Sequence, residues 1–113
     1  MTQKVEFFKD LIYNDQHVAV KVMMETQYSK EIRILFKEGQ SMREHQTDFP
    51  ITVQILKGTI EFGVGGAKHL LNEGDMIALD PKTPHDLLAL TQSIVHLSLS
   101  KEDSVGRVLK VIE

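Results

Sequence analysis

The chain has 113 residues, of which 42% are apolar and 26% are charged, and its formal net charge is −3. This length and composition predict one globular domain over residues 1–113. The net negative charge argues against nucleic-acid binding, which requires clustered Lys and Arg. No apolar run approaches a membrane span, and the first ten residues lack the apolar core of a secretion signal. There are no cysteines, which excludes disulfides and thiolate sites. We expect a cytoplasmic protein without a nucleic-acid or membrane partner.

The chain begins with a helical pattern and then changes to a strand pattern. Apolar residues at positions 5, 8, 11 and 12 predict a short N-terminal helix. Val18, Val20 and Val22 then alternate with other side chains, as in a half-buried strand. An edge strand of a small barrel needs a partner, so this strand is the candidate interface of a homodimer.

Short alternating runs separated by turn residues make up most of the remaining chain. They cover residues 32–36, 51–55, 60–64, 76–79, 85–90 and 94–99. The apolar phase slips by one residue at Gly58, which predicts a β-bulge or a sharp bend. Gly65 and Gly66 predict a tight hairpin turn. Strands this short and evenly spaced are typical of an all-β antiparallel sandwich or barrel, and not of an α/β fold.

Helical spacing returns after the last run. Val105, Val108, Leu109 and Ile112 share one helical face, and Ser100 is placed to begin the helix as a cap. We therefore expect a short C-terminal helix.

Two motifs each carry one histidine. The first begins at Gly39, reaches His45 after five residues and ends at Gly58. The second begins at Gly74 and reaches His85 through a turn that contains two prolines. Each motif has the pattern of strand, turn and strand, with the histidine where a barrel wall would present it inward.

These spacings resemble the two motifs of the cupin family, and the resemblance covers about residues 30–100. It implies one jelly-roll β-barrel of six to eight antiparallel strands, with short helices at one or both ends. In that family two His and a Glu from the first motif, and a His from the second, bind Fe, Mn, Ni, Cu or Zn. The resemblance places His45 and His85 at ligand positions, with Thr47 in place of the second His and Ile51 in place of the Glu.

The two substitutions leave two interpretations of the motif histidines open. In one they are metal ligands, and water or His96 completes the coordination; His96 would face the interior if its strand is covered on both faces. In the other they bond to loop backbone or line a pocket. The missing carboxylate raises the free-energy cost of placing a divalent cation in an apolar barrel.

Two functions follow as expectations. The first is binding of a small molecule in an apolar barrel cavity with a depleted metal site, and Arg43 would anchor an anionic ligand if its strand is regular. The alternative is a metal-dependent enzyme of the oxygenase or isomerase type, with His45 and His85 as core ligands of a divalent metal. The residues expected to line the pocket are Arg43, His45, Thr47, Ile51, Val53, His85 and Leu87.

Overall fold

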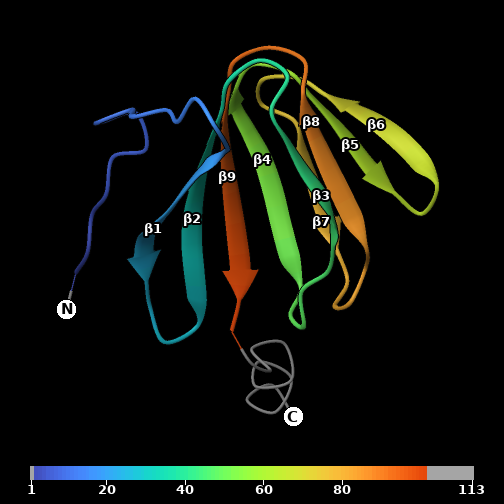
Figure 1. Cartoon of the computed structure of the whole chain (residues 1–113). Helices are drawn as coiled ribbons and strands as arrows, with labels where there is room; N and C mark the ends of the chain where they lie inside the picture. Colours follow the sequence, from blue (N-terminus) through green and yellow to red (C-terminus); the bar gives the residue numbers. More distant parts are fainter. Residues whose placement is uncertain (1, 102–113) are drawn as a thin grey trace, which may run out of the picture.

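The computed structural model describes residues 2–101, which form two antiparallel β-sheets packed face to face (Figure 1). This range contains nine strands and no helix, and therefore no helix that could cross a membrane. The strands are β1 Ala19–Glu25, β2 Ser29–Phe36, β3 Ser41–His45, β4 Ile51–Lys57, β5 Ile60–Val64, β6 Ala67–Leu71, β7 Met76–Leu79, β8 His85–Ala89 and β9 Ser93–Ser100.

The expected all-β jelly-roll architecture is confirmed. One sheet has the strand order β1-β2-β9-β4-β7, and the other has the order β3-β8-β5-β6. The described part has nine strands, more than the six to eight predicted, because β3 and β6 lack a regular alternation. A register shift interrupts β3, and four of the five residues of β6 are exposed.

The core lies between the sheets and is built from alternate residues of their strands. In β4, Ile51, Val53 and Ile55 are buried while the residues between them are partly exposed. The facing sheet contributes Ile60 and Phe62 to the same cluster. Each such buried side chain stabilises the fold by roughly 1.5–3 kcal/mol relative to an exposed one.

Gly58 forms the corner where the chain passes from β4 in one sheet to β5 in the other. Its φ is +89°, and a Cβ at this position would clash with the Ser93 side chain and lie 2.5 Å from the Gln92 carbonyl oxygen. Glycine alone meets both the backbone and the space requirement. The predicted bend at this residue is therefore confirmed.

The predicted N-terminal helix is wrong, because residues 2–18 contain no helical structure. Arg33 of β2 is buried, and its guanidinium donates hydrogen bonds to the carbonyl oxygens of residues 7, 9 and 10, at 3.2, 2.7 and 3.1 Å. These carbonyl oxygens therefore accept hydrogen bonds from Arg33 and not from backbone N–H groups of a helix. The predicted C-terminal helix lies outside the described residues.

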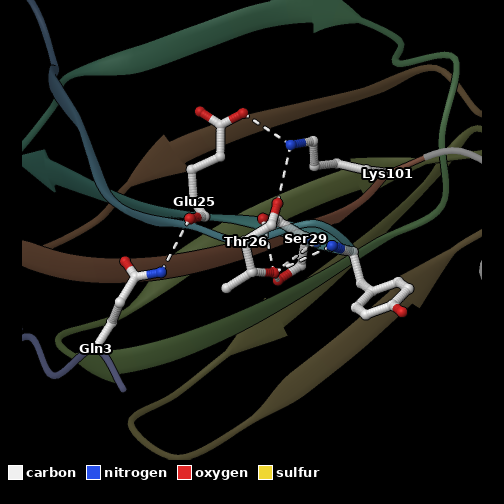
Figure 2. Close-up of polar contacts among 6 residues, drawn as sticks. Gln3, Glu25, Thr26, Ser29 and Lys101 are labelled. Atoms are coloured by element: carbon white, nitrogen blue, oxygen red, sulfur yellow. Dashed lines mark hydrogen bonds and ion pairs between the residues drawn. The ribbon is translucent and has the colours of Figure 1, made fainter. Parts of the chain in front are cut away.

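A polar cluster ties the β1–β2 turn to both ends of the described chain (Figure 2). Thr26 Oγ1 accepts a hydrogen bond from the backbone N–H of Ser29 at 3.1 Å. Lys101 donates to the Glu25 carboxylate at 2.8 Å and to the Thr26 carbonyl at 2.9 Å. Gln3 Nε2 donates to the Glu25 carbonyl at 3.3 Å. These contacts fix one end of the β1–β2 hairpin against the end of β9.

Candidate functional site

Two loops bring the motif histidines together at one end of the barrel. The β3–β4 loop follows His45 and the β7–β8 loop precedes His85, and both loops lie at the same end of the sandwich (Figure 1). The two histidines are direct partners across the β3–β8 ladder. The backbone N–H of Lys82 donates to the Thr47 carbonyl oxygen at 2.6 Å, which joins the two loops.

The two imidazoles are in contact and are tethered in the same way. Their ring centroids are 4.4 Å apart, with the planes tilted by 57°. His45 Nδ1 lies 2.7 Å from the Arg43 carbonyl oxygen, and His85 Nδ1 lies 2.9 Å from that of Thr83. A carbonyl only accepts, so each Nδ1 carries a proton, and the neutral form of each ring keeps a lone pair on Nε2. Through Nε2 this tautomer can accept a hydrogen bond or bind a metal.

His85 is the inner member of the pair. Its side chain is buried, and its Nε2 has no hydrogen-bond partner within residues 2–101. The Phe62 ring stacks on the imidazole, with centroids 5.6 Å apart and planes 5° from parallel. Burial lowers the pKa of His85, which the bond to the Thr83 carbonyl offsets only in part, and nearby His45 lowers it further. His85 Nε2 is thus a buried acceptor without a partner in the described part of the chain, a state that is costly unless something binds there.

The other two ligand positions of the family pattern provide no metal ligand. The Thr47 hydroxyl donates to the Phe49 carbonyl oxygen at 2.7 Å. Ile51 is buried in the core, paired with Leu79 on one side and Leu99 on the other. Across residues 2–101, no three His, Cys, Asp or Glu side chains form a group that could hold a metal. Two neutral imidazoles without a carboxylate do not fit a tightly held divalent cation in an apolar setting.

The expected apolar lining lies in the core below the histidine pair. Ile51, Val53 and Leu87 are 3%, 0% and 3% exposed and belong to one packed cluster. They are part of the packed core, so they do not line an open pocket.

Arg43 does not share the face of His45, because β3 is irregular between them. The β3–β8 register shifts between Met42 and His45, which inserts an extra residue into β3. Met42 packs against the core, whereas Arg43 and Glu44 are exposed. Arg43 instead lines a groove of about 380 Å³ on the outer surface of the sheet, together with Glu44 and Asp86.

His96 also lies apart from the motif histidines, on the outer face of β9. Its Nε2 lies 2.7 Å from Glu31 Oε1, and its ring is 4.6 Å from that of Phe7 in the N-terminal segment. The residues before and after it, Val95 and Leu97, occupy the core side. The strand is covered on both faces, but His96 faces the N-terminal segment and not the interior.

Two contributors to the site have no clear signal in the sequence. Phe62 is recognisable only as a strand residue, and its contact with His85 depends on the pairing of β5 with β8. The prolines before His85 indicate a turn, but they do not indicate that the Thr83 carbonyl orients the imidazole.

Comparison with known proteins identifies a matching family profile and structures with the same fold. The cupin domain family profile matches residues 33–100, which is more than half of the chain. No curated protein sequence matches it. An RmlC-like cupin protein from Desulfovibrio desulfuricans is similar in structure, with a TM-score of 0.81 and 21% identity over 88% of this chain and 97% of that chain.

Two further solved structures have the same fold. A conserved protein of unknown function from Streptococcus pyogenes has a TM-score of 0.76 and 17% identity, and the match covers 91% of this chain and 90% of that one. KdgF from Halomonas sp. has a TM-score of 0.74 and 20% identity, covering 92% and 99%. The profile match and the two-sheet architecture together show that this chain belongs to the cupin family.

Proposed function

We propose that this cupin binds a small molecule and that the His45–His85 pair is its polar recognition element. The observation that carries the proposal is the buried His85 Nε2, which lacks a hydrogen-bond partner within residues 2–101. Leaving a buried acceptor unsatisfied costs about 1–3 kcal/mol, so a ligand that supplies a donor gains from satisfying it. An apolar surround with a few fixed polar groups is common in small-molecule sites.

The ligand would sit at the barrel mouth, above the filled core. His45 is partly exposed while His85 is buried, so His45 is the rim-side contact and His85 the inner one. Thr47 lies in the adjoining loop, and its hydroxyl oxygen keeps lone pairs for a ligand after donating to the Phe49 carbonyl. Leu87 continues β8 below His85 and forms part of the packed core.

A fragment screen by heteronuclear NMR on the full chain tests this proposal. Bound fragments should shift the resonances of both motif histidines and of the β3–β4 and β7–β8 loops. His45→Ala and His85→Ala should each weaken binding by about tenfold or more. His69→Ala, at an exposed position on β6, should leave binding unchanged. A folded protein whose motif histidines respond to no fragment of a chemically diverse set would contradict the proposal.

A second candidate function is a metal-dependent cupin enzyme of the oxygenase or isomerase type. The observation that favours it is the bond of each Nδ1 to a backbone carbonyl, a device that orients metal-binding imidazoles in proteins. A bound Fe, Mn, Ni, Cu or Zn would supply Lewis-acid or redox chemistry. This function ranks second because no three His, Cys, Asp or Glu side chains among the described residues form a group that could hold a metal.

We also propose that two copies associate along β1, the edge strand of the larger sheet (Figure 1). Val20 and Val22 pair with Ile34 and Ile32, so their side chains lie on the core side of the sheet. They are nevertheless 56% and 48% exposed, because the facing sheet does not extend under β1. An unpaired edge with exposed apolar side chains is a surface that a second copy can cover.

A further inference from the structure

The histidine pair presents acceptors and no donors to a ligand. Each Nδ1–H is already bonded to a backbone carbonyl, so the lone pairs of the two Nε2 atoms are what remains available. Thr47 behaves in the same way, because its hydroxyl hydrogen is bonded to the Phe49 carbonyl. The apolar neighbour Phe62 adds neither a donor nor an acceptor.

The charged groups around the pair do not favour an anion. Arg43, the cation expected to anchor one, lies on the outer surface across the β3 bulge. Asp86 follows His85 directly, and its carboxylate acts on the imidazole electrostatically, in the direction that raises its pKa. Lys82 is exposed in the β7–β8 loop, where its backbone N–H bonds to Thr47. Of these charged side chains, the Asp86 carboxylate is the one that acts on His85, and its negative charge disfavours an anion there.

We infer that the pair binds an uncharged molecule that donates a hydrogen bond through a hydroxyl or N–H group, and that it discriminates against anions. The inference rests on the proposed function, because it names the ligand class of the same site. A donor satisfies the buried His85 Nε2, whereas the lone pairs of an anion would face those of the imidazoles. A cation would find no carboxylate at the ligand positions to offset its loss of hydration.

Three ring compounds of similar size separate these possibilities. Near neutral pH, phenol is uncharged and donates through its hydroxyl, anisole has the same ring without a donor, and benzoate is an anion without a donor. Binding is followed on the full chain through the ring resonances of His85. Phenol should bind about tenfold more tightly than anisole or benzoate, because only phenol supplies a donor to the orphaned acceptor. On phenol binding, His85 Nε2 should shift while Nδ1 stays unchanged.

Matched variants test whether the difference in affinity between phenol and anisole comes from His85 Nε2. His85→Phe keeps a flat ring and removes the lone pair, so phenol affinity should fall about tenfold, to the level of anisole. His69→Gln, at an exposed position on β6, should keep the full difference between phenol and anisole. If His85→Phe does not fold, His45→Phe tests the Nε2 acceptor of the partly exposed member of the pair, and phenol affinity should again fall toward that of anisole.

The possible outcomes distinguish a failure of the inferred ligand class from a failure of the proposed function. Equal binding of phenol and anisole would overturn the ligand class while leaving binding at the pair intact. Tighter binding of benzoate than of phenol would also overturn the ligand class. If Lys82→Ala abolished that binding, anion recognition would be assigned to the loop lysine. If no probe shifts His85 and the wider fragment screen also fails, both the ligand class and the proposed function are wrong.

Discussion

His45 and His85 are held as a matched pair, with ring centroids 4.4 Å apart and each Nδ1 bonded to the carbonyl of the residue two positions earlier. The shared tether gives both rings the same tautomer, with Nε2 available. The pair occupies two of the positions at which the family resemblance predicts metal ligands, while Thr47 and Ile51 provide no counterpart to the other two. This combination is the basis for proposing a ligand-binding barrel.

Restoring the two missing ligands should create a metal site. In Thr47→His/Ile51→Glu the new imidazole and carboxylate join the existing pair, so affinity for Zn or Mn should rise by about a hundredfold or more over wild type, measured by calorimetry. The metal-free variant should be less stable than wild type by roughly 2–4 kcal/mol, because Ile51 is buried and its replacement lacks a partner. Added metal should therefore raise its Tm.

The control for that variant is Thr47→Asn/Ile51→Gln, which changes size and polarity at the same positions without restoring the ligand set. A folded Thr47→His/Ile51→Glu protein that binds metal no better than this control would mean that the two positions do not face the histidine pair.

The corner at Gly58 should tolerate no side chain. Gly58→Ala combines a φ of +89° with a clash against Ser93 and the Gln92 carbonyl, and should cost about 3 kcal/mol or more in free energy of unfolding. Gly74→Ala is the matched control, because Gly74 has a φ of +92° and open space around its missing Cβ. It should cost only about 1 kcal/mol. Urea denaturation of both variants makes the comparison, and equal losses would contradict the close packing at Gly58.

The contacts of Glu31 between β2 and β9 make the stability of the protein depend on pH in the acid range. Its carboxylate lies 2.7 Å from His96 Nε2 and accepts a hydrogen bond from Ser98 Oγ at 2.9 Å. Burial works to raise the pKa of Glu31, but hydrogen bonds from Ser29, His96 and Ser98 outweigh it and lower the pKa below its usual 4.5. Because the folded-state pKa is lowered, this stabilisation is complete above the unfolded-state pKa and is lost as pH falls through the folded one.

Glu31→Gln should therefore lower the free energy of unfolding by about 1 kcal/mol near neutral pH. The difference from wild type should shrink as the pH falls below about 4.5. Urea denaturation across this pH range measures both effects, with the exposed Glu44→Gln as a control that should change neither. A difference that stays constant across the range would show that the charge of Glu31 contributes nothing.

The proposed dimer makes a prediction about β1. Val20→Asp/Val22→Asp places two charges on the exposed strip, so the variant should be monomeric by light scattering while wild type is dimeric. Leu70→Asp/Met76→Asp changes two side chains that are equally exposed but lie on β6 and β7, and it should remain a dimer. A monomeric wild type, or dissociation of the control instead, would contradict the placement of the interface.

Local features of the sequence predicted the strands and the corner, because alternation and a glycine phase slip are visible without tertiary information. The same approach failed at the N-terminus, where helical spacing was overruled by the three carbonyl hydrogen bonds of Arg33. It missed β3 as a regular strand, because the bulge after Met42 breaks its alternation.

For the site, motif spacing predicted His45 and His85, and the structure places their two rings in contact. The same spacing could not position Arg43, because one extra residue in a strand reverses the face of a side chain. The stacking of Phe62 on His85 depends on which strands pair, a property of the whole sheet that no local pattern contains.

The measurement that tests the central claim most directly is the metal content of the full chain, purified without a histidine tag or chelator and analysed by mass spectrometry. His45→Ala and His85→Ala are prepared beside wild type. The proposed ligand-binding pair predicts a folded wild type with little metal, which takes up none of Fe, Mn, Ni, Cu or Zn stoichiometrically when each is offered. Near-stoichiometric metal in wild type, abolished by both substitutions, would contradict this and make the metal-dependent enzyme the leading function.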